Sequence, residues 1–210
     1  MKRPISVSKL LRKEQKQYEL TGLWAKAMGS PEVGGIWIVY GNEKNGKTWV
    51  TLMLADMMSK IDKVLYISAE EGTGANFKES CNRAKLDIKN KRLLFSEYMP
   101  IEDIRTLLKR RYRPGVVVID NTTVYGKELK GIDIVNLMRE FPNVLFIILA
   151  HAKGKEPDGA TAVMAKKMAK IIFRVEGLAA FISGRCPGGV ISIDETKSAL
   201  YWGESLKEIA

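Results

Sequence analysis

The stretch that decides the fold is residues 41–48, which read Gly41-Asn42-Glu43-Lys44-Asn45-Gly46-Lys47-Thr48. It fits the pattern GxxxxGK[ST], and it lies between an apolar run at 36–40 and a segment with helical spacing at 46–60. Glycines at both ends let the backbone turn tightly, so that successive N–H groups converge, and the following helix adds the positive end of its dipole. A strand, this loop and a helix in that order identify a phosphate-binding P-loop.

The residue types in this loop indicate a nucleotide and a metal ion. Lys47 is expected to reach the β- and γ-phosphates, and the Thr48 hydroxyl is expected to ligate Mg²⁺. Lys44-Asn45 stands where many such loops carry glycine, and asparagine tolerates the left-handed conformation, so the loop can still close. The other expected nucleotide contacts are Gly41, Asn42, Glu43, Lys44, Gly46 and Trp49. The expected cofactors are therefore ATP and Mg²⁺.

Strand and helix patterns alternate along most of the chain. Continuous apolar runs indicate strands that are buried on both faces, and their alternation with helices predicts a mainly parallel sheet covered on both sides. We predict strands at 36–40, 64–68, 93–95, 116–119 and 144–150, and helices at 46–60, 77–84, 101–111 and 132–141. Four short glycine-separated pieces, at 171–175, 179–183, 190–193 and 199–202, predict antiparallel hairpins at the sheet edge.

The N-terminal part has a different pattern. Residues 1–32 are predicted to form one basic amphipathic helical segment, which Gly29-Ser30-Pro31 ends. Residues 33–210 are predicted to form the core domain. The first twenty residues lack the apolar region of a secretory signal, and the longest strongly apolar stretch, 144–150, is too short to span a bilayer. We therefore expect a cytoplasmic protein with no membrane partner.

The charge of the chain favours a polyanionic partner. The 210 residues include 34 Lys and Arg against 24 Asp and Glu, which gives a net charge of +10. Such a balance most often indicates nucleic acid. One histidine and two cysteines cannot build a four-ligand zinc cluster of the usual type.

The apolar run 116–119 ends in Asp120. An aspartate at the end of a buried strand beside a P-loop occupies the Walker B position, where it holds Mg²⁺ directly or through water. Asp120 is therefore the second expected metal residue, with Thr48.

The sequence after the second strand resembles that of RecA-like ATPases, which include the RecA and RadA recombinases and the DnaB-type helicases. Residues 64–68 run directly into Ala69-Glu70-Glu71-Gly72. In that family a glutamate at this place polarises the water that attacks the γ-phosphate, so the resemblance implies this role for Glu70, with Glu71 as the reserve. It also implies a three-layer α/β core with a mainly parallel sheet and C-terminal antiparallel hairpins.

The resemblance implies two further active-site residues. His151 follows the strand at 144–150, where the family places a polar sensor of the γ-phosphate. The run Ser183-Gly184-Arg185-Cys186-Pro187-Gly188 resembles the turn that carries an arginine finger into a neighbouring subunit's site, although Ser183 replaces the usual lysine. Arg185 is therefore expected to act on the ATP site of another copy.

The family's two DNA-facing loops correspond to residues 121–131, with Lys127 and Lys130, and 153–159, with Lys153 and Lys155. The leading interpretation is a RecA-like protein, of the kind that phages and mobile elements encode, that binds and hydrolyses ATP and acts on DNA in recombination or replication. Its expected partners are single-stranded DNA and further copies of itself, in a ring or filament with shared ATP sites. Two alternatives remain open: a nucleotide-dependent regulator or assembly module with weak hydrolysis, and a small-molecule P-loop kinase.

Overall fold

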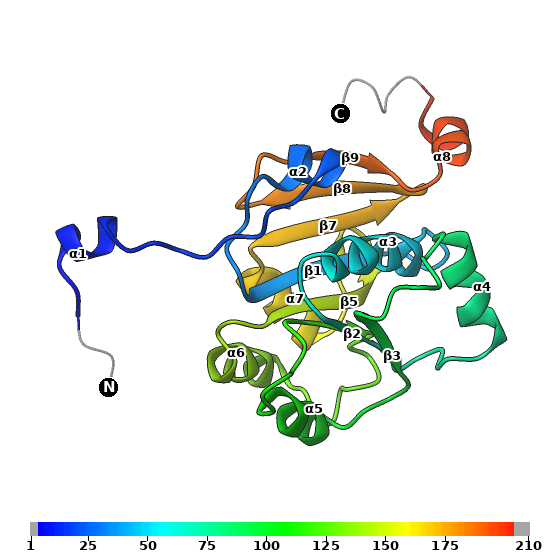
Figure 1. Ribbon diagram of the computed structural model, residues 1–210. Helices are drawn as coiled ribbons and strands as arrows, with labels where there is room; N and C mark the ends of the chain where they lie inside the picture. The colour runs from blue at the N-terminus through cyan, green and yellow to red at the C-terminus, as the bar shows by residue number, and fades with distance from the viewer. Residues whose placement is uncertain (1–3, 204–210) are drawn as a thin grey trace.

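The computed structural model describes residues 4–203 and places one mixed β-sheet between helices (Figure 1). The strands are β1 (Gly35–Gly41), β2 (Val64–Ser68), β3 (Leu93–Ser96), β4 (Val116–Asp120), β5 (Leu145–Lys153), β6 (Glu156–Pro157), β7 (Ile171–Glu176), β8 (Ala179–Gly184) and β9 (Gly189–Ser192). The helices are α1 (Val7–Leu11), α2 (Gly22–Met28), α3 (Lys47–Ser59), α4 (Ala75–Arg83), α5 (Ile101–Leu108), α6 (Gly131–Glu140), α7 (Ala160–Met168) and α8 (Glu195–Trp202).

The sheet has the strand order β3-β2-β4-β5-β1-β7-β8-β9, and β6 pairs with the end of β5. The strands from β3 to β7 in this order are parallel, and β8 and β9 are antiparallel to their neighbours. Every residue of β1, β2 and β4 is buried, as their continuous apolar runs predict. The predicted mixed α/β fold class is therefore confirmed.

Two hydrophobic cores lie on the two faces of the sheet. Because side chains alternate along a strand, Trp37 and Val39 enter one core while Ile36 and Ile38 enter the other. The first core also receives side chains from α2, α3 and α4, and the second receives them from α5, α6 and α7. This arrangement gives three layers and leaves the ends of the parallel strands free to carry polar residues.

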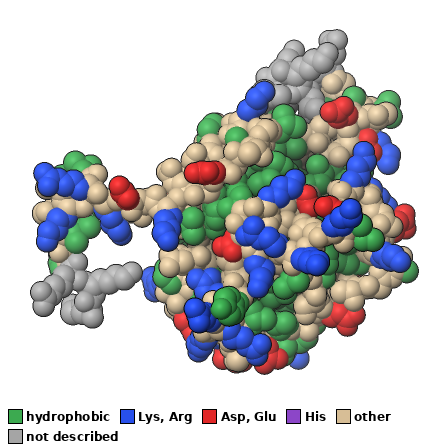
Figure 2. All heavy atoms as spheres, in the orientation of Figure 1, with side chains coloured by type: hydrophobic (Ala, Val, Ile, Leu, Met, Phe, Trp, Pro, Cys, Tyr) green, Lys and Arg blue, Asp and Glu red, His purple; other side chains and the backbone are tan. Residues whose placement is uncertain are grey.

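The prediction of one N-terminal helix is wrong. Two short helices, α1 and α2, are separated by an extended stretch in which the Tyr18 N–H donates to Pro31 O at 2.8 Å. The Tyr18 side chain lies in the first core, and this packing outweighs the helical pattern of the sequence. α1 stands away from the body and carries hydrophobic and basic side chains (Figures 1 and 2). The division at residue 32 stays a prediction.

The C-terminal pieces also differ from expectation. Residues 199–202 belong to α8 and not to a strand, because Asp194 caps this helix by accepting from the Lys197 N–H at 3.0 Å. The other three pieces form the predicted antiparallel hairpins β7–β8 and β8–β9, and β7 also pairs in parallel with β1. The segment 153–159 is largely the short β5–β6 hairpin, and α7 follows it without having been predicted.

Among residues 4–203, no helix has both the length and the apolar character needed to cross a membrane. The cytoplasmic location stays a prediction.

Candidate active site

The P-loop connects the end of β1 to the start of α3. Gly46 has a φ of +95°, a left-handed conformation that favours glycine, and a Cβ there would lie 2.8 Å from Leu178 Cδ2, so that side chain would have to move. The other left-handed residue is Lys44, with a φ of +60°. Asn45, which the sequence suggested for a left-handed position, does not have a positive φ. Its side chain instead makes hydrogen bonds within the protein.

Asn45 connects the P-loop to the turn between β7 and β8. Its Oδ1 accepts from the Gly177 N–H at 2.8 Å, and its Nδ2 donates to Glu43 O at 3.0 Å. The side chain therefore stabilises the loop through protein contacts.

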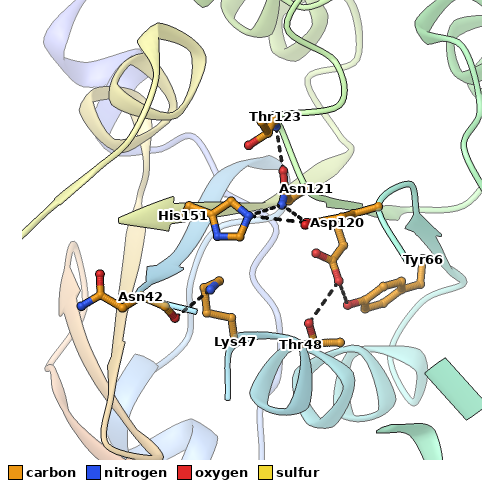
Figure 3. A network of polar contacts seen from close by, with 9 residues as sticks. Asn42, Lys47, Thr48, Tyr66, Asp120, Asn121, Thr123 and His151 are labelled. Carbon is orange, nitrogen blue, oxygen red and sulfur yellow. Dashed lines mark hydrogen bonds and ion pairs between the residues drawn. The ribbon is translucent and has the colours of Figure 1, made fainter. Parts of the chain in front are cut away.

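Lys47 points back across the P-loop. Its Nζ donates to Asn42 O at 2.9 Å (Figure 3). Burial lowers the pKa of Lys47, while the negative charges of Asp120 and Glu70 oppose that change. A phosphate group beside Nζ would offset the cost of burying this ammonium group.

Thr48 and Asp120 bring two oxygen ligands together. The Thr48 hydroxyl lies 3.5 Å from Asp120 Oδ2, and the same Oδ2 accepts from the Tyr66 hydroxyl at 2.7 Å (Figure 3). The parallel register pairs Asp120 with Ser68 at the ends of β4 and β2. A hydroxyl and a carboxylate beside a phosphate-binding loop are oxygen donors that suit Mg²⁺, so the residues present fit the expected ion.

The pKa of Asp120 is raised to about 7, chiefly because the carboxyl group is buried. The charges of Glu71 and Glu70 raise this pKa further, whereas the hydrogen bond from Tyr66 lowers it. The ionised form of Asp120 is therefore costly in the free protein, and a bound cation would stabilise it.

Asn121 lies at the centre of a second cluster of polar side chains. Its Nδ2 donates to Glu70 Oε2 and lies 2.8 Å from His151 Nε2, and the latter atom is 3.5 Å from Glu70 Oε2. The register pairs His151 with Gly41, so this strand-end histidine lies beside the P-loop. Glu71 borders the same pocket without being part of this network. Asn121 was missed by the sequence analysis, although its position directly after Asp120 could have indicated it.

These residues border one pocket of about 580 Å³. The P-loop contributes Glu43, Lys44, Gly46, Lys47 and Thr48 to its lining, whereas the predicted nucleotide contacts Gly41 and Asn42 line a separate cavity. The lining also includes Ser80, Arg83, Leu178 and Lys197, which the sequence did not single out. At one end the Arg83 guanidinium lies 5.5 Å from the centre of the Trp49 ring. The pocket thus combines the P-loop, the oxygen pair of Thr48 and Asp120, and the Trp49–Arg83 pair.

Neither a protein-family model nor a curated protein matches the chain by sequence. Solved structures do match. The flagellar accessory protein FlaH from Methanocaldococcus jannaschii aligns with a TM-score of 0.61 and 17% identity over 85% of this chain and 92% of its own. A KaiC-like protein from Pyrococcus horikoshii OT3 aligns with a TM-score of 0.61 and 13% identity over 82% and 89%. Both have the RecA-like P-loop fold.

The chain has the RecA-like P-loop ATPase fold. The predicted three-layer RecA-like core is therefore confirmed. At identities of 17% and 13% the likeness concerns the fold, so the roles of individual residues rest on the geometry of the pocket.

Arg185 lies far from the P-loop pocket of the same chain. Gly184 pairs with Ile171 at the start of β7, whereas the P-loop follows the end of β1, where Gly41 pairs with Val175. The Arg185 turn and the P-loop thus lie at opposite ends of the strands. The expected action of Arg185 on the ATP site of another copy stays a prediction.

The two segments with the predicted DNA-facing lysines lie side by side. The Thr161 hydroxyl at the start of α7 donates to Leu129 O, and a cavity of about 430 Å³ lies between the segments, with Lys130 and Asp158 in its wall. Lys127 is exposed, and Lys153 and Lys155 lie on the β5–β6 hairpin. Since these segments follow Asn121 and His151 directly, they adjoin the proposed site.

Proposed function

We propose that this RecA-like chain binds ATP with Mg²⁺ and hydrolyses it. The observation that carries the proposal is one pocket that brings Lys47, Thr48 and Asp120 together with Glu70. A phosphate loop with an oxygen ligand pair and a separate carboxylate are the groups that phosphoryl transfer to water requires.

Each residue has a distinct part in this proposal. Lys47 and the N–H groups of the loop bind the phosphates, and Thr48 and Asp120 hold the ion. Bound Mg²⁺ would neutralise charge on the β- and γ-phosphates. Glu70, whose side chain is 49% exposed toward the pocket, accepts a proton from the attacking water and orients it.

Trp49 and Arg83 form the end of the pocket that suits the nucleobase. A guanidinium group and an indole ring both offer a flat surface for stacking. Equilibrium binding of ATP, with and without Mg²⁺, tests the site as a whole: ATP should bind more tightly with the ion. Absence of any ATP binding would contradict the proposal.

We further propose that the chain acts on single-stranded DNA as a homo-oligomer. The net charge of +10 and the adjoining segments that carry Lys127, Lys130, Lys153 and Lys155 support this proposal. Binding to labelled single-stranded DNA should be tight at low salt and weaken steeply as salt rises, because bound lysines and arginines release counterions. No binding at low salt in the presence of a non-hydrolysable ATP analogue would remove DNA as the partner.

A second candidate function is a nucleotide-dependent regulator. The likeness to FlaH favours it, since that protein is described as a flagellar accessory protein. ATP turnover measured with and without single-stranded DNA separates the two functions. Stimulation by DNA supports action on DNA, whereas slow turnover that DNA leaves unchanged supports the regulator.

A further inference from the structure

We propose that Asn121 is a positioning residue that orients the Glu70 carboxylate and sets the tautomer of His151. Asn121 is 1% exposed, and its one amide group contacts both of these side chains and the segment that follows. The part of the proposal that concerns turnover rests on the proposed ATPase function. The part that concerns the tautomer does not.

The orientation of the Asn121 amide follows from its oxygen. Oδ1 accepts from the Thr123 N–H at 2.7 Å, and a backbone N–H can only donate (Figure 3). The other end of the amide must then be Nδ2, and this atom faces Glu70 Oε2 and His151 Nε2. Both hydrogens of Nδ2 are thus used, and all polar atoms of the side chain have partners.

The same contacts determine the state of His151. Because Nε2 faces a donor, it must be the ring nitrogen without a hydrogen, and a neutral imidazole then carries its hydrogen on Nδ1. Nδ1 is buried and has no partner among residues 4–203. His151 alone would gain more by placing the hydrogen on Nε2, which is 3.5 Å from the Glu70 carboxylate. Asn121 therefore holds the ring in the tautomer that it would not otherwise adopt.

Asn121 also restrains the proposed catalytic carboxylate. The Glu70 side chain is 49% exposed, and its polar side-chain partners among the described residues are Asn121 and His151. Without Asn121 the carboxylate would sample several rotamers, and fewer of them would face the attacking water. Loss of Asn121 should therefore slow turnover and leave ATP binding largely intact.

Nitrogen NMR of the histidine ring tests the tautomer directly. His151 is the only histidine of the chain, so untagged protein labelled with ¹⁵N-histidine gives one pair of ring signals. At about pH 8, where an ordinary histidine is neutral, the wild type should show a protonated Nδ1 and an unprotonated Nε2. The reverse pattern in the wild type would overturn the proposal.

The variant Asn121→Asp keeps the size of the side chain and an acceptor for the Thr123 N–H, but it removes the donor to His151. In this variant Nε2 should become protonated, because it now faces an acceptor. Thr123→Ala, which keeps the backbone N–H, is the matched control and should retain the wild-type signals. Unchanged ring signals in Asn121→Asp would show that Asn121 does not set the tautomer.

Kinetics test the orientation of Glu70. Asn121→Ala and Asn121→Asp should lower kcat for ATP at least ~10-fold while KM changes less than about 2-fold, the pattern of an interaction lost in the transition state. Unchanged kcat in both variants would overturn this part. A wild type without ATPase activity would contradict the proposed function instead, and the ring signals would still decide the tautomer.

Discussion

Tyr66 donates its hydroxyl hydrogen to Asp120 Oδ2 at 2.7 Å, and both side chains are buried, Tyr66 in the middle of β2 and Asp120 at the end of β4. This hydrogen bond partly offsets the cost of burying the carboxylate, and it leaves the pKa of Asp120 at about 7. The proposed metal site is therefore a source of instability in the free protein. Replacement of Asp120 should therefore stabilise the fold and, at the same time, remove the proposed Mg²⁺ ligand.

Asp120→Asn should stabilise the nucleotide-free protein at alkaline pH. An unfolded aspartate releases its proton near pH 3.9, whereas the pKa of folded Asp120 is about 7, so this group lowers the free energy of unfolding as pH rises from about 4 to about 7. A neutral asparagine can still accept from Tyr66. We expect thermal denaturation at pH 8 to show a Tm at least ~3 °C above that of the wild type, which corresponds to about 1 kcal/mol.

The difference in Tm should shrink toward pH 5, where Asp120 is largely protonated in the folded protein. Mg²⁺ with ATP should raise the Tm of the wild type more than that of Asp120→Asn. An equal Tm for the two proteins at pH 8 would show that Asp120 is not a costly buried carboxylate.

The core of the fold could be predicted because its signals are local. The apolar runs of β1, β2 and β4 and the P-loop pattern identified the parallel strands and the end of the sheet that carries the site. Tyr18 and α8 show where this reasoning fails. Tyr18 fits a helical pattern, and its burial in the first core became visible only in three dimensions.

The pocket also combines residues that the sequence could predict with residues that it could not. Residues that follow a strand directly, such as Asp120 and His151, were identified from the sequence. Arg83 and Lys197 enter the pocket from α4 and α8, and no spacing relates them to the P-loop. Asn121 was missed because asparagine at a strand end is common in turns, and only its contacts reveal another use.

Glu70→Gln should retain ATP binding and lower turnover at least ~10²-fold, since the amide cannot accept a proton from the attacking water. Glu71→Gln should have a smaller effect, because Glu71 has no contact with Asn121 or His151 among the hydrogen bonds of the described residues. Steady-state ATP hydrolysis and ATP binding, measured for both variants, check this. A larger loss in Glu71→Gln would exchange the roles of the two glutamates.

Arg83→Ala should weaken ATP binding roughly 5-fold, which corresponds to the loss of about 1 kcal/mol of stacking. Tripolyphosphate has no base, so Arg83→Ala should weaken its binding no more than Lys78→Ala does. Lys78→Ala is the control, because it removes the same charge from the exposed face of α4. Calorimetric titrations with both ligands provide the comparison. Equal weakening of ATP and tripolyphosphate would show that Arg83 interacts with the phosphates.

Arg185 should act only between copies of the chain. Lys47→Ala retains Arg185 but lacks a working pocket, and Arg185→Ala has the reverse defect, so a mixture of the two should recover part of the ATPase activity at mixed interfaces. Activity per subunit of the wild type should also rise with protein concentration. No recovery in the mixture, together with a monomer by light scattering in the presence of ATP and DNA, would make Arg185 a surface residue.

The central claim is that the P-loop pocket hydrolyses ATP, and Mg²⁺-dependent phosphate release by the wild type and by Lys47→Ala tests it most directly. The Lys47 side chain makes one hydrogen bond among the described residues, to Asn42 O, so its loss should leave the fold intact, which circular dichroism checks. The account predicts hydrolysis by the wild type that requires Mg²⁺ and that Lys47→Ala abolishes. Equal hydrolysis by wild type and a folded Lys47→Ala would contradict it.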